Sequence, residues 1–572
     1  MFRKYNNLWL AFFVTLFCFV FTYFVFGFYY VEYEALANSF LSGKITPGIP
    51  FRAIYFLMHH GTSHLYSLLY EHFPNVEWIS WILSFYFFLA GFLGMYIIAE
   101  LVPKEKPKWQ RITWMLMVYL LVFADHNIHF IFTRISYITV GTAFLGLIYF
   151  FGSIADIKKR PFLFIGINLL FTLGALCRIE SSAALSVLLF VFSWIYLRSI
   201  RQSILLFLYP ILFLGCFIIG LSYHIKNSTE FYAEVEPEIE VQFVERQNKI
   251  PLSEMKTLQD SAKYKIAAEI AWVDPKVISP EFMRSMIQKE GFMYTDGRQW
   301  RRVFGDMVLV IGNNMALSLF TVILGLLVVL GADPKDRYKW LLYLLFFWFY
   351  LLIQAYTFKI NDRSFLPNAA MFIFSLLLMS ARLFYSKSRS YWHYAACIAI
   401  ILFTIFQVNY LIKESKILRE DLANYQYNTQ KIEQTAKGKY LVVNSSSFDY
   451  IFSSHKPFYP FDYSAFKKIY ITEGHVIPYI PYYREYLEGD CKCDVYNFPS
   501  FWTYLKSIKE EVIIMSTPQR MDVLKEYMGV MYGYQLNIEP IPMPLLKVRK
   551  SDYRDVYWDL QMYELKADTT AY

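Results

Sequence analysis

The chain has 572 residues, of which 56% are hydrophobic, 20% aromatic and only 18% charged. A soluble protein of this composition would expose large apolar patches, so the composition excludes a soluble enzyme, a disordered chain and a disulfide-rich scaffold. The net charge of +8 does not indicate nucleic-acid binding, because basic loops of a membrane protein produce the same excess. We therefore expect a polytopic membrane protein with some water-exposed mass.

Eleven apolar stretches predict membrane-crossing helices, since a span needs about 20 mostly apolar residues. They lie near residues 8–29, 78–101, 112–124, 134–152, 162–177, 182–197, 203–223, 306–331, 340–356, 364–381 and 391–411. The third and fifth stretches are short, which predicts tilted or re-entrant segments. The first follows Arg3 and Lys4 and lacks a small-residue cleavage site, so we interpret it as a retained anchor.

Basic residues mark every second connection between these stretches. They precede the first stretch and recur in alternate loops, as in Lys104–Arg111, Lys158–Arg160 and Lys335–Lys339. Loops on the cytoplasmic side of a membrane collect Lys and Arg. The alternation therefore predicts a cytoplasmic N-terminus and an extracytoplasmic C-terminus in a multi-pass protein, which we assign to the inner (cytoplasmic) membrane of a bacterial cell.

Three longer segments then fall on the outer side. The first, 30–77, contains amphipathic pieces that predict helices lying in the membrane interface. The second, 224–305, is charged and helix-prone. In the third, three strand-like runs precede a helix-like run capped by Ser516: Tyr440–Asn444, Lys468–Thr472, Glu511–Met515 and Ser516–Tyr527. The sequence thus predicts an all-α membrane domain over residues 1–412 and a small extracytoplasmic α/β domain over residues 413–572.

Acidic and histidine side chains at the membrane edge are costly to keep, which makes them functional candidates. Glu32 and Glu34 follow the first span, where a carboxylate can act as a general base or hold a divalent cation; the alternative is that both simply face water. Asp125 and His129 follow the third span and are four residues apart, so on a helix they share a face. With Glu32 or Glu34 they would form a cation site, whereas an interfacial hydrogen bond is the alternative for His129.

Three arginines lie at the predicted outer face of the membrane: Arg134, Arg178 and Arg363. A guanidinium group suits a phosphate bidentately, and lipid phosphates lie at that depth. The structural alternative is that Arg178 pairs with Glu180, and Arg363 with Asp362, to tie helix ends together. For Arg134 we favour the structural interpretation.

The first outer segment resembles that of the membrane-embedded GT-C glycosyltransferases, such as aminoarabinose transferases and protein O-mannosyltransferases. Its matching residues are Ala37, Phe40, Leu41, Gly43 and Pro47. Two later segments, Gly174–Glu180 and Arg363–Pro367, resemble the family's Gly-Leu-x-x-Arg-x-Glu-like turn and its Arg-Tyr-Leu-Leu-Pro segment.

One position departs from the family pattern. The family places an acidic residue about two helical turns before the Ala, where this chain has Tyr29 and Tyr30, and Glu32 and Glu34 stand closer to the Ala. Which carboxylate serves as the base, and whether a metal is required, are therefore left open.

The resemblance implies a transferase that moves a sugar from a polyprenyl-phosphate donor to an extracytoplasmic glycolipid, glycan or protein. It implies Glu32 as the base, with Glu34 and Asp125 as alternates, and Arg178 and Arg363 as ligands of the donor phosphate, with Arg134 as a third. A divalent cation held by Glu32, Asp125 and His129 would be the sole cofactor. Apart from the membrane, the expected partners are the donor lipid and the acceptor, without nucleic acid.

Three other functions remain open from the sequence. A polymerase or ligase of lipid-linked glycans would share a basic outer cleft but would use a diphosphate-linked donor. A transporter would place charges near the bilayer midplane, often within inverted repeats; the spans are nearly free of central charges, and no repeat is visible. A non-catalytic scaffold would need none of the outer-face charges.

Overall fold

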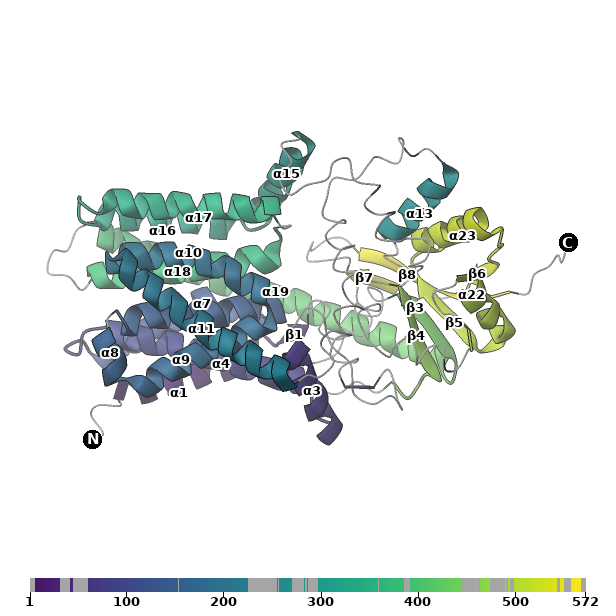
Figure 1. Ribbon diagram of the computed structural model, residues 1–572, viewed down its shortest axis with the longest axis horizontal. Coiled ribbons are helices and arrows are strands. Elements are labelled where there is room, and N and C mark those ends of the chain that lie inside the picture. Colours follow the sequence, from purple (N-terminus) through teal and green to yellow (C-terminus); the bar gives the residue numbers. More distant parts are fainter. Residues whose placement is uncertain are drawn as a thin grey trace.

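The computed structural model describes residues 6–30, 42–44, 60–152, 154–224, 255, 257–269, 282, 285, 297–357, 360–384, 391–444, 458, 463–473, 489, 492–493, 498–542, 546–549 and 557–566. Figure 1 shows a bundle of long helices beside a separate C-terminal domain built around a sheet. The N-terminus lies at the end of the bundle that points away from this domain, so the two ends of the chain lie on opposite sides of the bundle. Glu32 and Glu34 and most of residues 224–305 lie outside the described residues.

The described helices of the bundle follow the predicted apolar stretches. They are α1 (Asn6–Val25), α4 (Trp78–Leu101), α5 (Lys108–Val118), α7 (Phe132–Phe150), α9 (Pro161–Cys177), α10 (Ile179–Leu197), α11 (Ile200–His224), α15 (Gly297–Asn313), α16 (Met315–Gly331), α17 (Arg337–Thr357), α18 (Asp362–Phe384) and α19 (Tyr391–Ala436). Shorter helices are α3 (His60–His72), α6 (Ala124–Ile128), α8 (Ile154–Lys159) and α13 (Leu258–Glu269). The chain is therefore a polytopic helical membrane protein.

The number of spans is smaller than the eleven predicted. Among the described residues, eight helices are long and apolar enough to cross a membrane, and a ninth is added if α15 and α16, bent by 90° at their junction, count as one span. The two remaining predicted stretches are helical but short: α9 has 17 residues, and α5 continues into a π-helix, Tyr119–Phe123, labelled η2. These were the two stretches that the sequence marked as short.

Helix α7 lies at the centre of the bundle. It is buried along almost its whole length and packs against α4, α9, α10 and α18. Glycines permit this close packing, as small residues do in membrane bundles. A Cβ atom added at Gly141 would lie 2.4 Å from the Met371 sulfur, and one at Gly174 would lie 2.9 Å from the Thr139 side chain. Arg134, in the first turn of this helix, is therefore held by a rigid element.

The C-terminal domain contains a mixed sheet covered by helices. Its strands are β3 (Tyr440–Asn444), β4 (Lys468–Glu473), β5 (Val512–Ser516), β6 (Ile538–Pro540), β7 (Leu546–Arg549) and β8 (Tyr557–Leu565), and its helices are α22 (Phe498–Ser507) and α23 (Pro518–Tyr532). The strand order is β4-β3-β5-β8-β6, with β7 pairing with β8. Strand β3 is parallel to β4 and β5, whereas β8 is antiparallel to its neighbours.

The three predicted strands are confirmed, but the predicted helix cap is wrong. Helix α23 starts at Pro518, and the Thr517 hydroxyl, rather than Ser516, accepts the hydrogen bond from the Arg520 amide. The reason is that proline fits the first helical position, where its fixed φ suits the helix and its missing N–H is not needed. Ser516 instead completes strand β5.

Helix α19 connects the membrane region to the C-terminal domain. Its 46 residues contain no glycine or proline and span about 70 Å at 1.5 Å per residue, roughly twice what a bilayer core requires. The helix runs without a break past residue 413, where the sequence suggested a domain boundary, and continues out of the bundle toward the sheet (Figure 1).

Candidate functional site

A two-stranded parallel pairing joins the start of the first outer segment to the connection before α7. Helix α1 ends at Val25, and Gly27, at a φ of +87°, turns the chain into strand β1 (Tyr29–Tyr30). A positive φ at this place favours glycine. Tyr29 is paired with His129, and Tyr30 with Phe130, of strand β2 (His129–Phe130). The residues directly before Glu32 in the chain therefore lie beside His129.

His129 lies between two carboxylates that come from distant parts of the chain. Its Nδ1 is 3.2 Å from Asp125 Oδ1 and 3.2 Å from the Asp125 backbone oxygen, and its Nε2 is 3.1 Å from Glu414 Oε1 on α19. Arg134 Nη1 donates to Asp125 Oδ2 at 3.2 Å. We call these four side chains, Asp125, His129, Arg134 and Glu414, the buried charge cluster; each residue is less than 10% exposed.

The electrostatics of the buried charge cluster follow from its pairing. Burial by itself would lower the pKa of His129, but the charge of Asp125 and hydrogen bonds to Asp125 and Glu414 raise it to about 9. Burial would raise the pKa of Asp125, but His129 and Arg134 hold it well below its usual range. At neutral pH the His129 cation thus faces the Asp125 carboxylate, whose other oxygen is bound by Arg134. Such a balance is what makes charges tolerable away from water.

The local backbone favours a functional role for this connection. The π-helix Tyr119–Phe123 directly precedes α6, which carries Asp125, and single π turns are frequent at functional sites. The fully buried Asn127 donates from its amide to the Tyr119 hydroxyl at 3.3 Å, which fixes the short helix against the π turn. Among the described residues, His126 Nδ1, Asn127 Oδ1 and Arg134 Nε are buried without a hydrogen-bond partner, so they are available to a polar group bound here.

Arg178 lies beside the start of α7. Its Nη1 donates to Thr133 Oγ1 at 3.2 Å, and its guanidinium carbon is 5.9 Å from the centre of the Phe132 ring. The predicted partner Glu180 is 3.9 Å away, but its side chain is 69% exposed, so this pair contributes little. The Arg178 side chain is 23% exposed, so it is partly accessible to solvent. Arg134, by contrast, is engaged by Asp125, a contact that fits the structural interpretation.

Arg363 lies in the first turn of α18, next to Asp362, whose Oδ1 accepts from the Asn314 amide at 2.7 Å. A buried polar chain joins α18 to α7. Its hydrogen bonds run from Tyr350 OH to Asn368 Oδ1 (3.2 Å), from Asn368 Nδ2 to Gln354 Oε1 (3.1 Å) and from Gln354 Nε2 to Tyr137 OH (3.0 Å). Helix α7, which carries Arg134, and helix α18, which carries Arg363, are therefore joined through α17 by these buried hydrogen bonds.

The predicted cation site stays a prediction. Within the described residues, no group of three or more His, Cys, Asp and Glu side chains is arranged to hold a metal ion. Both ring nitrogens of His129 face carboxylates, so neither offers a free lone pair, which a metal ligand needs. Glu32 and Glu34 lie outside the described residues, and a cation held by Glu32 stays a prediction.

Three residues on α19 were not among the predicted candidates. Glu414 joins the buried charge cluster. Ser415 Oγ donates to the Phe26 backbone oxygen at 2.7 Å, and Arg419 donates to the Val25 backbone oxygen. Glu414 lies just beyond the end of the last predicted span, in the position that drew attention to Glu32 after the first. The same criterion, applied to the last span, would have found it.

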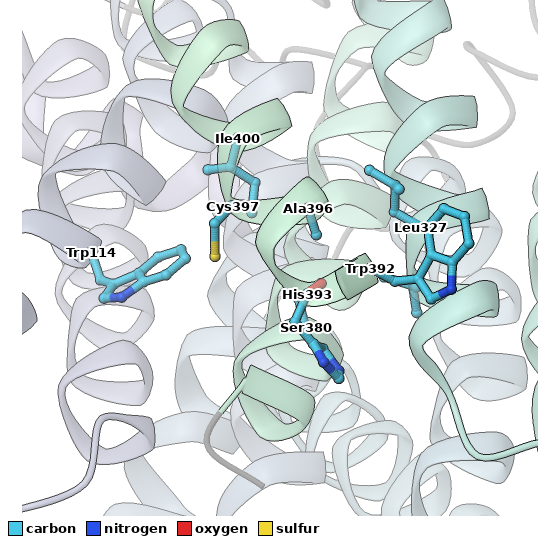
Figure 2. A pocket seen from close by; sticks show the side chains of 9 residues that line it. Trp114, Leu327, Ser380, Trp392, His393, Ala396, Cys397 and Ile400 are labelled. Carbon is cyan, nitrogen blue, oxygen red and sulfur yellow. The ribbon is translucent and has the colours of Figure 1, made fainter. Parts of the chain in front are cut away.

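A pocket lies beside the first turns of α19. Its lining residues are Trp114, Leu327, Val328, Ser380, Trp392, His393, Ala396, Cys397 and Ile400, and Figure 2 shows His393, Ser380 and Cys397 among apolar side chains. His393 and Glu414 are 21 positions apart on one helix, which is about 30 Å, the thickness of a hydrocarbon core. The pocket and the buried charge cluster thus lie at opposite edges of the bundle.

The comparisons with known proteins leave the family open. Neither the protein-family models, nor the curated proteins, nor the solved structures that were searched give a match to this chain. What the chain does has to be argued from its own residues.

Proposed function

We propose that the protein is a membrane glycosyltransferase of the GT-C type. It would transfer a sugar from a polyprenyl-phosphate donor to an acceptor on the side of the membrane that holds the C-terminal domain. The observation that carries this proposal is the pairing of β1 with β2 beside the buried charge cluster. It fixes the chain directly before Glu32 next to the connection that leads into Arg134, and Arg178 lies near the same helix start.

Glu32 is the proposed general base, with Glu34 as the alternate. Asp125 is a weaker candidate because His129 and Arg134 hold its pKa well below its usual range, and so weak a base takes a proton poorly at neutral pH. The role that suits Asp125 is to hold His129 and Arg134 in place. This leaves the two carboxylates of the first outer segment to act on the acceptor.

Arg178 and Arg363 are the proposed ligands of the donor phosphate. In the transfer, the acceptor oxygen or nitrogen bonds to the anomeric carbon as its proton passes to Glu32. The bond between the anomeric carbon and the phosphate oxygen breaks, and the polyprenyl phosphate leaves with the bonding electron pair. Guanidinium groups stabilise the developing charge on that oxygen. The partial exposure of Arg178 is compatible with such a contact.

The disulfide of Cys493 supports an extracytoplasmic position for the C-terminal domain. Cys493 is disulfide-bonded, whereas Cys18, Cys177, Cys216 and Cys397 are free. Disulfides persist in oxidising compartments and are rare in the cytosol. Together with the basic loops, this bond agrees with a cytoplasmic N-terminus and a site on the outer side of a bacterial inner membrane.

The test is transfer by the purified full chain in proteoliposomes. Polyprenyl-monophosphate sugars are the expected donors, and Glu32→Gln or Arg178→Ala should reduce transfer by about 10²–10⁴-fold. Arg198→Ala is the matched control, because Arg198 pairs with Asp336 at the opposite edge of the bundle and its side chain is 64% exposed. Transfer from diphosphate-linked donors alone would instead indicate a polymerase or ligase. Absence of transfer from either donor class, or full activity of both variants, would overturn the proposal.

A further inference from the structure

One face of α19 contacts both sides of the candidate site. Glu414 accepts from His129 of β2, and Ser415, one position on, donates to the Phe26 backbone oxygen at the end of α1. Arg419, about one further turn along the helix, donates to the Val25 backbone oxygen. The last carbonyls of a helix lack partners within it, and a cation is favoured there by the helix dipole. We call Glu414, Ser415 and Arg419 the α19 clamp.

Two of the three contacts of the α19 clamp are buried, those of Glu414 and Ser415. Glu414 and Ser415 are 2% and 4% exposed, so water does not compete for these two contacts. The clamp residues contact β2 and the chain immediately before β1. The pairing of these two strands fixes the segment leading to Glu32.

We propose that the α19 clamp positions the start of the first outer segment, and with it the base, for transfer. The expected effect on kinetics rests on the proposed function, whereas the positioning of this segment does not. Because α19 runs on to Ala436 and the chain then enters β3, the C-terminal domain is mechanically joined to the clamp. Helix α13 also contacts this domain, because Lys265 Nζ lies 2.6 Å from Glu526 of α23.

Glu414→Gln is the variant that tests the clamp, and Glu420→Gln is its control on the same helix. Glu420 is six residues further on, has a side chain that is 65% exposed and lies 4.0 Å from Lys416. Hydrogen exchange measures the positioning without any activity. Glu414→Gln should speed exchange in peptides that contain Tyr29–Tyr30 and His129–Phe130, whereas Glu420→Gln should not. Equal exchange in both variants, at unchanged thermal stability, would overturn the inference.

A kinetic experiment tests whether this positioning contributes to sugar transfer. Glu414→Gln should lower kcat by about 10–100-fold with little change in KM for the donor, since misplacing a reacting group by about 1 Å has effects of this size. His129→Gln should act through the same contact, so the double variant should lose little more than either single variant. Additive losses would contradict a shared role. If the wild type transfers no sugar while exchange responds as expected, the proposed function fails and the clamp stands.

Discussion

The buried charge cluster and an ion pair at the opposite edge of the helix bundle differ in their exposure to water. At the edge facing the C-terminal domain, Asp125, His129, Arg134 and Glu414 are all buried and pair with one another. At the other edge, the Lys159 side chain, paired with Asp156, is 72% exposed. Exposed pairs contribute about 0–1 kcal/mol to stability, whereas burying charges costs free energy that good geometry must offset.

This difference supports the proposal that function resides at the buried charge cluster. A buried charge cluster is weak evidence for stability, because apolar residues of similar volume would often stabilise as well. Ionisable groups kept near membrane depth are expensive and usually functional. The predicted membrane orientation would by itself account for the basic residues at the opposite edge. The following substitutions test this contrast, from the largest expected effect to the smallest.

Breaking the buried charge cluster should cost far more than breaking an exposed pair. Asp125→Asn leaves Arg134 buried without its counter-charge, so we expect a loss of about 3–5 kcal/mol in the free energy of unfolding. Asp156→Asn, at the opposite edge, should cost less than about 1 kcal/mol. Denaturant unfolding in mixed micelles, followed by tryptophan fluorescence, measures both. Similar losses in the two variants would mean that the edges do not differ energetically.

The charge on His129 should make stability depend on pH. Its folded-state pKa of about 9 lies above the value of about 6.5 for an unfolded chain. The stabilisation is therefore complete below about pH 6.5 and is lost as pH rises through 9, at about 1.4 kcal/mol per unit of pKa difference at most. Melting temperatures from pH 6 to 10 should fall in the wild type. A His129→Gln variant that kept the same decline would assign the effect to another group.

The rigidity of α7 should be sensitive to one added methyl group. Gly141→Ala would place a Cβ atom 2.4 Å from the Met371 sulfur, and we expect a loss of about 1–3 kcal/mol from overpacking. Gly166→Ala on α9 is the matched control, because nothing lies within 4 Å of its added Cβ. Replacing a helical glycine there should be neutral or stabilising by roughly 0.5–1 kcal/mol. The same unfolding assay measures both variants. A Gly141→Ala protein as stable as the wild type would mean that α7 tolerates movement.

Much of the fold was predictable from the sequence because its signals are local. Apolar length predicted every stretch that became a membrane helix, and apolar β-branched runs predicted β3, β4 and β5. The spacing of Asp125 and His129 predicted a shared helical face; helix α6 ends at Ile128, and His129 belongs to strand β2, but the two side chains still lie 3.2 Å apart. The span count was too high because α5 and α9 are too short by themselves, and only their packing makes them part of the bundle.

The candidate site was harder to predict because its contacts are remote. Glu414 and His129 are 285 positions apart, and no local pattern reports such a contact. Strands β1 and β2 have two residues each, too few for any periodicity. Tyr29 and Tyr30 drew attention only as the place where the GT-C pattern has an acid, whereas their backbone pairing with β2 is what connects the first outer segment to the buried charge cluster.

The most direct test of this account is to find where the donor binds. A polyprenyl-phosphate sugar with a photoreactive group beside its phosphate, crosslinked to the full chain in proteoliposomes and mapped by mass spectrometry, reports the position of the phosphate. The account predicts crosslinks in peptides containing Thr133–Tyr137 and Arg178, and their loss when unlabelled donor competes. Competed crosslinks confined to Leu327–Val328 and Trp392–Ile400, at the opposite edge of the bundle, would contradict it.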